Sequence, residues 1–315
     1  MTAPRSARAF AKLNLALAVA PPEPPESARA GWHRIASWMV PIALHDDVTV
    51  EPLARGAAGR LDIRWADDAP LRAGQGVDWP AAADLAARAR AALEAEVDRQ
   101  LPSDITIRKR ICAGAGLGGG SADAAAVLQL LDVAFDLGLG PARLRQIGAH
   151  LGSDIPFFID DDLRASPRAA LVTDFGEVAQ RWPAPEAACV LVIPHFQCAT
   201  AEVYRAFDRL APGPLRAQEI TEMVIAGSAA LAGGGARLFN DLAGAAESIE
   251  PRLASLRAAI GAEAGLPAHV TGSGSAMFVL PPADEARPLA ERLARIASPG
   301  VALATTTVSD SMGVA

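Results

Sequence analysis

Several short stretches of the chain alternate hydrophobic and polar residues, which is the pattern of a strand with one buried face. The alternation is clear in residues 104–111, whose sequence is DITIRKRI, and similar patterns predict strands near residues 48–50 and 61–65. Residues 82–97 instead place hydrophobic residues at helical spacing. The pattern therefore predicts mixed helices and strands in the first half of the chain.

The segment after the strand predicted at residues 104–111 is rich in glycine. Five glycines lie between residues 114 and 120, and Ser121 then opens an alanine-rich run with helical spacing of its hydrophobic residues. Such a cluster indicates turns with positive φ or close approach of a ligand. With Ser121 as N-cap, the helix start offers unpaired N–H groups and a positive dipole to an anion, which we interpret as a phosphate. A tight connection whose glycines serve packing is the alternative.

Two familiar phosphate-binding loops do not fit this segment. Gly114, Gly116 and Gly119 match the letters G-x-G-x-x-G, but no second strand ending in an acidic residue follows at the expected distance. A Walker A loop is excluded, because Gly119 is followed by Gly120 and Ser121 with no lysine. A phosphate loop of a third kind remains.

Residues 1–22 imitate a secretory signal peptide, with early arginines and an apolar stretch. Lys12 and Asn14 interrupt that stretch and Pro21 directly follows the apparent cleavage point, so we expect no signal peptide. At a period of two, the odd-numbered residues of 11–19 share one face of a strand, while Lys12 and Asn14 lie together on the other. No run of residues has the length of a membrane span.

Composition narrows the classes of function. The chain has 315 residues, of which 51% are hydrophobic and 21% charged, and it is long enough for two globular domains. A formal net charge of −7 without a basic block argues against nucleic acid or a membrane surface as partner. Cys112, Cys189 and Cys198 have no metal-ligand spacing, which favours a reduced, cytoplasmic compartment, and the five histidines form no zinc motif.

Rare residue types point to side chains that matter individually. Arginine and alanine are abundant, whereas Lys12 and Lys109 are the only lysines, Asn14 and Asn240 the only asparagines, and Tyr204 the only tyrosine. This usage is typical of a GC-rich coding sequence, which disfavours the codons of these three residue types. Lys12 is then expected to be retained for its ammonium group, a compact point charge that arginine does not imitate. Chance survival is the alternative.

Two later segments carry candidate chemistry. Asp154 stands between the end of a helix at Gly152 and the apolar run 155–159, which suits either an acid–base group or a simple turn cap. Gly272 and Gly274 separate two strand-like runs and, taken alone, suit a hairpin turn. These residues become informative only together with the other motifs.

The order of the motifs resembles the GHMP kinase superfamily. AKLNLALAV, GWH, KRICAGAGLGGGSADAA, LGSDIPFFI, TAEVY, FNDL and TGSGSAMF follow one another from about residue 10 to residue 278. The resemblance implies an α+β protein with the two-domain GHMP kinase fold. A domain like ribosomal protein S5 domain 2 is expected at residues 1–165 and a ferredoxin-like domain at residues 166–315, with the active site in the cleft between them.

Within the superfamily, the motifs are similar to those of kinases that use ATP to phosphorylate the 2-hydroxyl group of a cytidine-diphosphate-linked methylerythritol, in the non-mevalonate isoprenoid pathway. By motif match, Asp154 takes the hydroxyl proton, while Lys12 positions the hydroxyl group and offsets developing charge. Magnesium is expected as the ATP complex, with no protein ligand assigned. The residues implied to surround the ATP phosphates are Cys112, Ala113, Gly114, Ala115, Gly116, Leu117, Gly118, Gly119, Gly120, Ser121 and Ala122.

The resemblance also implies how the cytidyl substrate is held. Trp32 and Tyr204 are expected to stack on the two sides of the cytosine, His33 to hydrogen-bond the base, and Asn14 to help hold the substrate. The other residues implied in substrate binding are Thr200, Gly272, Ser273 and Gly274. We expect a monomer or a weak homodimer that binds these small molecules, without a nucleic-acid or membrane partner.

Three features depart from the family's pattern. Cys112 stands where proline is usual, Ala122 replaces the second serine of G-G-G-S-S, and no acidic residue precedes Gly31. A missing hydroxyl group near the phosphates is expected to weaken nucleotide or metal binding. Two alternatives therefore stay open, namely another small-molecule GHMP kinase of the mevalonate or homoserine type, and a nucleotide-binding relative without activity.

Overall fold

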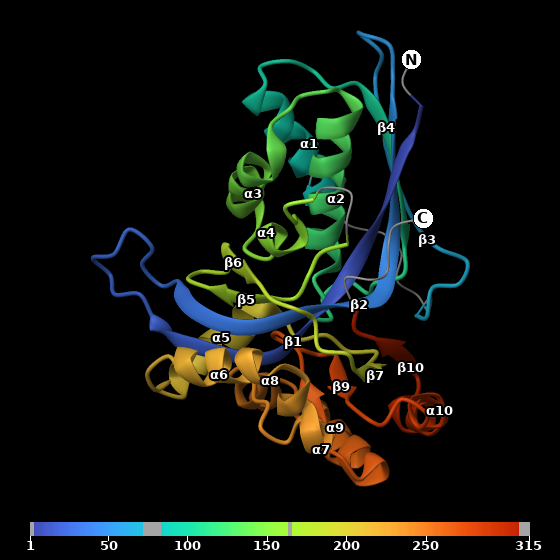
Figure 1. Cartoon of the computed structure of the whole chain (residues 1–315). Coiled ribbons are helices and arrows are strands. Elements are labelled where there is room, and N and C mark those ends of the chain that lie inside the picture. Colours follow the sequence, from blue (N-terminus) through green and yellow to red (C-terminus); the bar gives the residue numbers. More distant parts are fainter. Residues whose placement is uncertain (1–2, 72–82, 163–165, 309–315) are drawn as a thin grey trace.

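The computed structural model describes residues 3–71, 83–162 and 166–308. Figure 1 shows an upper half, with helices beside long strands, and a lower half, in which the later helices surround a second sheet. The first sheet has six strands in the order β3-β4-β2-β5-β6, with β1 also paired to β2. These strands are β1 (Arg5–Pro22), β2 (His33–Pro52), β3 (Leu61–Trp65), β4 (Ser103–Lys109), β5 (Ala170–Thr173) and β6 (Val178–Arg181).

Four helices belong to the upper half, and α2 lies at its centre. They are α1 (Leu85–Glu96), α2 (Gly119–Ala134), α3 (Gly140–Leu151) and α4 (Ile155–Phe158). Alanine and leucine side chains of α2 are buried on several sides, because the helix packs between the first sheet and the neighbouring helices α1, α3 and α4. The small alanine side chains let the helix lie close to the sheet.

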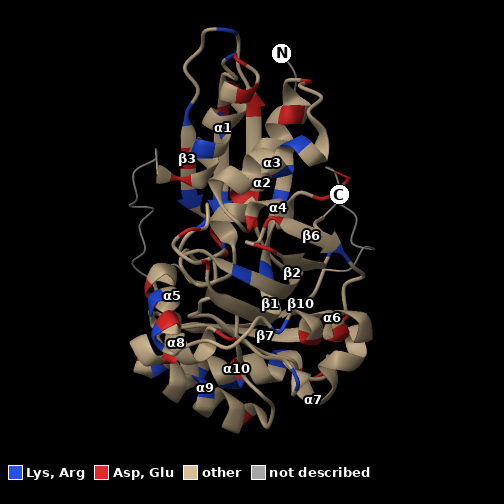
Figure 2. Ribbon diagram, turned by 90° about the vertical axis from the view of Figure 1, so that its left-hand side faces the viewer, with Lys and Arg blue, Asp and Glu red and all other residues tan. Residues whose placement is uncertain are grey.

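The lower half is built on a four-stranded sheet in the order β10-β7-β9-β8. Its strands are β7 (Ala188–Ile193), β8 (His269–Val270), β9 (Met277–Val279) and β10 (Val301–Thr306). Its helices are α5 (Thr200–Arg209), α6 (Ala217–Ala226), the short 3-10 helix η2 (Gly227–Leu231), α7 (Ala232–Gly235), α8 (Ala243–Ile249), α9 (Pro251–Ala264) and α10 (Ala286–Ala297). The predicted α+β fold class is confirmed, and Figure 2 shows basic and acidic residues intermingled in both halves.

The local predictions for the upper half hold with two corrections. The strands at 61–65 and 103–109 and the helix at 85–96 are present, while residue 82 of the predicted helix lies outside the described residues. Ser121 was expected to cap α2, but the helix begins at Gly119 with Gly118 as N-cap. Gly118 has φ of 73°, so the glycine turn itself starts the helix, and Ser121 lies within its first turn.

The second correction concerns strand β1. Residues 11–19 were expected to keep one hydrophobic face, and Leu13 and Leu15 do pack in the same hydrophobic cluster. The pairing with β2 then shifts between Asn14 and Ala16, which is a β-bulge at Leu15. Leu17 consequently packs in the other hydrophobic cluster, because an extra residue reverses the faces of the strand that follows.

The two sheets suggest where one domain ends and the next begins. Strands β5 and β6 hydrogen-bond within the first sheet, although they lie after the predicted boundary of 165/166. Strand β7 is the first strand of the second sheet. We therefore propose that the boundary falls within residues 182–187. Among the described residues, no helix combines the length and the apolar character needed to cross a membrane.

Candidate active site

The glycine loop forms a tight turn at the start of α2. Gly114, Gly116 and Gly118 have φ values of 70°, 80° and 73°, a conformation that residues with a Cβ rarely adopt. A Cβ at Gly116 would lie 2.6 Å from the backbone oxygen of Thr271, so the loop also passes close to the second domain. No side chain caps the first turn of α2, which leaves its N–H groups available to an anion.

Both halves of the molecule hold the loop in place. The Leu117 carbonyl accepts a hydrogen bond from the Lys12 amide at 3.0 Å, and the Ala115 carbonyl accepts one from the Ala276 amide at 3.1 Å. The two unusual residues of the loop, Cys112 and Ala122, are only 4% and 2% exposed. Both therefore pack within the protein, and burial raises the pKa of the Cys112 thiol to about 11, which keeps it protonated at neutral pH.

The predicted catalytic pair meets beside this loop. Lys12 comes from β1 and Asp154 precedes α4, and the Lys12 Nζ lies 3.5 Å from the Asp154 Oδ2. Asp154 was open to interpretation as a turn cap, but its side chain makes no capping hydrogen bond to α4. The Lys12 side chain is 4% exposed and that of Asp154 is 29% exposed, so the carboxylate is the part of the pair that solvent reaches.

Asn14 is a direct hydrogen-bond partner of Lys12. It shares a strand face with Lys12, as predicted, and its Oδ1 accepts a hydrogen bond of 2.5 Å from the Lys12 Nζ. Its Nδ2 donates to the Ser37 hydroxyl group at 2.8 Å, which fixes the direction of the amide. The Asn14 backbone amide donates to the Thr271 hydroxyl group at 2.8 Å, so β1 is tied directly to the loop between β8 and β9.

The loop between β8 and β9 brings the second domain to the same place. A Cβ at Gly272 would lie 3.4 Å from the Lys12 Nζ, and the Ser273 hydroxyl group is 2.9 Å from that of Thr200 at the start of α5. Asn240 donates hydrogen bonds to the carbonyls of Val270 and Gly272 at 2.9 and 2.8 Å. Asn240, the second asparagine of the chain, therefore stabilises the backbone conformation of this loop.

The aromatic side chains near the site lie in two contacting pairs. Trp32, expected to stack on one side of the cytosine, contacts Phe175 in an edge-to-face arrangement, with centroids 6.2 Å apart. Trp32 is 55% exposed, and the guanidinium of Arg29 lies over both rings, 4.4 Å from the Phe175 centroid. Tyr204 instead contacts His33, with centroids 4.9 Å apart. Of these four rings only that of Trp32 is exposed, while Phe175, His33 and Tyr204 are half-buried.

His33 and Tyr204 form the second contacting pair. The Nδ1 of His33 is 2.9 Å from the Ala20 carbonyl and its Nε2 is 3.4 Å from the Asp208 carboxylate. Both ring nitrogens thus have partners, and the expected bond to a base requires Asp208 to give up the Nε2. Burial, together with the nearby charge of Asp154, raises the pKa of Tyr204 to about 12, so its phenol stays neutral at physiological pH.

A buried cluster of charged side chains lies next to the segment that enters the glycine loop. The Lys109 Nζ lies 2.5 Å from Asp46 Oδ2 and 2.6 Å from Asp123 Oδ2, and all three side chains are at most 5% exposed. Asp46 also accepts backbone hydrogen bonds from Arg110 and, at 2.8 Å, from Ile111. The cluster therefore fixes the chain just before the loop begins.

Sequence reasoning missed Phe175 and Asp46. Phe175 lies in a turn between two four-residue strands, with no local pattern to distinguish it from the other phenylalanines. Asp46 is one of two adjacent aspartates in a strand, and only the rarity of Lys109 hinted that this lysine has a specific partner. Both residues acquire their partners through contacts between distant parts of the chain.

The fold and the site define a small-molecule kinase of the GHMP class. The family model described as "GHMP kinases N terminal domain" matches residues 83–161, and "GHMP kinases C terminal" matches residues 220–298. The predicted two-domain GHMP kinase fold is thereby confirmed.

Individual relatives show to which family of GHMP kinases the chain belongs. A 4-diphosphocytidyl-2-C-methyl-D-erythritol kinase of Pelotomaculum thermopropionicum is 34% identical over 87% of this chain and 88% of its own length. One of Nocardioides sp. is 34% identical over 96% of this chain and 97% of its own. A solved structure of 4-(cytidine 5'-diphospho)-2C-methyl-D-erythritol kinase, 29% identical, covers 99% of this chain and 100% of its own with a TM-score of 0.72. The chain belongs to the 4-diphosphocytidyl-2-C-methyl-D-erythritol kinase family.

Proposed function

We propose that this protein transfers the γ-phosphoryl group of ATP to the 2-hydroxyl group of 4-diphosphocytidyl-2-C-methyl-D-erythritol, a step of the non-mevalonate route to isoprenoid precursors. The observation that carries the proposal is the meeting of Lys12 and Asp154, 3.5 Å apart, beside the glycine loop. An ammonium and a carboxylate at a helix start that binds anions are the groups that phosphoryl transfer to an alcohol requires.

The chemistry follows from the positions of these groups. The substrate hydroxyl oxygen forms a bond to the γ-phosphorus while the bond from that phosphorus to the bridging oxygen of ADP breaks. Asp154 takes the hydroxyl proton, and ADP leaves. Lys12 offsets the charge on the reacting oxygens, and the free N–H groups at the start of α2 hold the phosphates of ATP. Most of the rate enhancement then comes from alignment and fixed charges.

Mg²⁺ is expected to accompany the nucleotide. Among the described residues, no three carboxylate, histidine or cysteine side chains are grouped to hold a metal ion by themselves. The site still fits Mg²⁺, because this ion is usually held by nucleotide phosphates, waters and one or two protein oxygens. Ser121, in the first turn of α2, would offer a hydroxyl oxygen to the ion beside the phosphates. When bound, the ion neutralises phosphate charge.

Trp32 and Tyr204 are proposed to bind the cytosine from its two sides. The Trp32 ring is exposed, and Tyr204 contacts His33, the proposed hydrogen-bond partner of the base, close enough to Asp154 for that charge to affect the Tyr204 pKa. A flat base gains from stacking on exposed aromatic rings. We further propose a cytoplasmic location, since Cys112, Cys189 and Cys198 are free and buried thiols. The expectation of a monomer or weak homodimer stays a prediction.

The direct test is to mix the purified protein with Mg-ATP and 4-diphosphocytidyl-2-C-methyl-D-erythritol. We expect one ADP and one 2-phosphorylated product for each turnover, identified by mass spectrometry and ³¹P NMR. Mevalonate and homoserine serve as controls, because kinases of those types are the alternatives within the GHMP class. Phosphorylation of either control in preference to the cytidyl substrate contradicts the proposal, and ATP binding without any transfer supports an inactive relative.

The nucleotide pocket makes a second prediction. Replacing Trp32 or Tyr204 with alanine is expected to raise KM for the cytidyl substrate roughly 5- to 150-fold, since stacking of a base on an aromatic ring contributes about 1–3 kcal/mol. KM for ATP is expected to change little. Val178→Ala is a control, because Val178 is an exposed hydrophobic residue at the start of β6 and is not one of the proposed stacking residues. An equal rise of both KM values would argue against the assigned pocket.

A further inference from the structure

The proposed base stands at the start of a very short helix. Asp154 directly precedes α4, which has four residues, Ile155–Phe158. A helix of one turn has no stability of its own in water, because nucleation costs more than a single turn returns. The position of the Asp154 carboxylate is therefore set by the contacts of α4 with the rest of the fold, namely its buried side chains and the groups that hold its two ends.

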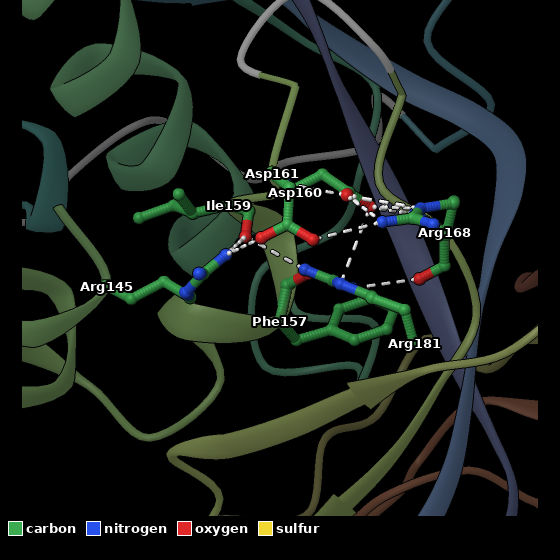
Figure 3. A network of polar contacts seen from close by, with 7 residues as sticks. All are labelled: Arg145, Phe157, Ile159, Asp160, Asp161, Arg168 and Arg181. Atoms are coloured by element: carbon green, nitrogen blue, oxygen red, sulfur yellow. Dashed lines mark hydrogen bonds and ion pairs between the residues drawn. The ribbon is translucent and has the colours of Figure 1, made fainter. Parts of the chain in front are cut away.

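Arg181, at the end of β6, holds the far end of α4. Its Nη2 donates hydrogen bonds to the carbonyls of Phe157 and Ile159 at 2.8 and 2.9 Å, and its Nη1 donates to the Arg168 carbonyl at 2.9 Å (Figure 3). The Arg181 side chain is 9% exposed, and its guanidinium lies over the Phe157 ring. One planar side chain thus satisfies carbonyl groups at the end of the helix, where a cation is also favoured by the helix dipole.

A buried carboxylate keeps Arg181 in this place. The Arg181 Nε lies 3.4 Å from the Asp160 Oδ2, and the Asp160 side chain is 2% exposed. Burial by itself raises the pKa of Asp160, but hydrogen bonds from Arg168 and the charge of Arg181 lower it overall, so the carboxylate stays charged. Figure 3 shows Arg168 and Arg181 converging on Asp160, with Arg145 at the outer side of the network.

The other end of α4 is held by the same hairpin. Strands β5 and β6 are joined by residues 174–177, and a Cβ at Gly176 would lie 2.9 Å from the Ser153 Cβ and 3.1 Å from the Ser153 carbonyl oxygen. The turn of the hairpin therefore rests on the residue just before Asp154. Phe175, in the same turn, contacts Trp32. The hairpin thus touches both ends of the segment that carries the base, and also the ring proposed to bind cytosine.

We propose that the β5–β6 hairpin is the element that positions the base, with Arg181 as its positioning residue, and that cytosine bound against Trp32, whose ring contacts Phe175, steadies Asp154 through this hairpin. The inference rests on the proposed function, because it assigns the base role to Asp154. Binding energy from the nucleotide, a part of the substrate that does not react, is then used to orient the reacting groups. This arrangement favours substrates that carry the cytidyl group.

The test compares Arg181→Gln and Arg181→Lys with the wild type. We expect Arg181→Gln to lower kcat roughly 10- to 100-fold, since a displacement of about 1 Å at a reacting group costs up to about 100-fold. KM for ATP and for the cytidyl substrate should stay near the wild-type values, because neither binding surface is removed. Arg181→Lys keeps the charge beside Asp160 but loses the planar guanidinium that hydrogen-bonds to several carbonyls. Its kcat should therefore lie between those of the wild type and Arg181→Gln.

Arg145→Gln is the matched control, because Arg145 also donates to the Ile159 carbonyl but lies at the exposed side of the network. Hydrogen exchange of residues 153–159 gives a readout that does not depend on turnover. We expect faster exchange there in Arg181→Gln than in Arg145→Gln, and slower exchange in the wild type when cytidine diphosphate is added. If Arg181→Gln does not fold, the same comparison of kcat and hydrogen exchange is made with Arg181→Lys.

The outcomes separate this inference from the proposed function. A wild-type protein that phosphorylates the substrate, with unchanged kcat and exchange in both Arg181 variants, overturns the positioning role and leaves the function intact. A wild-type protein without turnover overturns the function, while exchange at residues 153–159 still tests the hairpin. Loss of kcat accompanied by an equal rise of both KM values would indicate general structural damage and would also overturn the inference.

Discussion

Replacing Asp154 with asparagine is expected to lower kcat for phosphoryl transfer by roughly 10²- to 10⁴-fold, the usual contribution of a positioned acid–base group. Asparagine has nearly the same shape but accepts no proton, and it also leaves the ammonium of Lys12 without the carboxylate 3.5 Å away. ATP binding should persist, because the glycine loop and the start of α2 are unchanged. Steady-state kinetics with both substrates, combined with ATP-binding calorimetry, measures the two effects separately.

Asp161→Asn is the control for this prediction. Asp161 follows α4, is exposed, and forms ion pairs with Arg145 and Arg168 rather than with Lys12. Its replacement should leave kcat close to the wild-type value, because surface ion pairs contribute little. If Asp154→Asn keeps the wild-type kcat, the proton is accepted elsewhere and the assignment of the base is wrong.

Replacing Asp46 with asparagine is expected to have the largest effect on stability, a loss of roughly 3–5 kcal/mol in the free energy of unfolding, as when one partner of a buried ion pair is removed. The Asp46 carboxylate accepts hydrogen bonds from Lys109, Arg110 and Ile111. The asparagine side chain has an NH₂ group in place of one carboxylate oxygen, and this group cannot accept the hydrogen bond of the N–H donor that it faces. KM for ATP should rise as well, because the cluster anchors the chain that enters the glycine loop. Urea unfolding and ATP kinetics measure the two effects.

Asp123→Asn is the matched variant in the same cluster. The Oδ1 of Asp123 has no hydrogen-bond partner among the described residues, so its replacement should cost less than that of Asp46. Burial raises the pKa of Asp123 above its ordinary value, only partly opposed by Lys109. The folded protein then keeps a proton that the unfolded chain releases, so this carboxyl lowers the free energy of unfolding as pH rises from about 4 to about 8, where the folded protein releases the proton too. Asp123→Asn should lack that part of the pH dependence, and equal losses in both variants would contradict this account.

The strand, glycine loop and helix were predictable because their signals are local. Alternation of Ile105 and Ile107, the run of glycines and the apolar spacing after Ser121 each depend on neighbours within a few residues. The same holds for Lys12 and Asn14, whose separation of two residues places them on one strand face and within hydrogen-bonding distance. Rarity of lysine and asparagine drew attention to these residues, although it said nothing about their partners.

Local signals failed where packing between distant segments overrides periodicity. The bulge at Leu15 reverses the faces of β1, since residues on β2 set the pairing, and no feature of residues 11–19 reports it. Helix α2 begins at Gly119, earlier than predicted, for a related reason. The left-handed turn at Gly118 packs against Phe158 and Lys12, which are distant in sequence. The contact of Trp32 with Phe175 was likewise not predicted, since Phe175 reaches Trp32 from another hairpin.

The sequence by itself therefore determined the strand, glycine loop and helix, and Lys12 and Asn14 as candidate residues, because residue chemistry and short-range periodicity are written in the chain. The order of its motifs, through their resemblance to GHMP kinases, gave the fold class and singled out Asp154. Only the tertiary structure decided which groups meet. The 3.5 Å approach of Lys12 to Asp154, the aromatic contact with Phe175 and the hold of the β5–β6 hairpin on α4 all join segments that are far apart in sequence. Such contacts form when buried surfaces and paired charges outweigh the entropy of closing long loops, and that balance belongs to the whole fold.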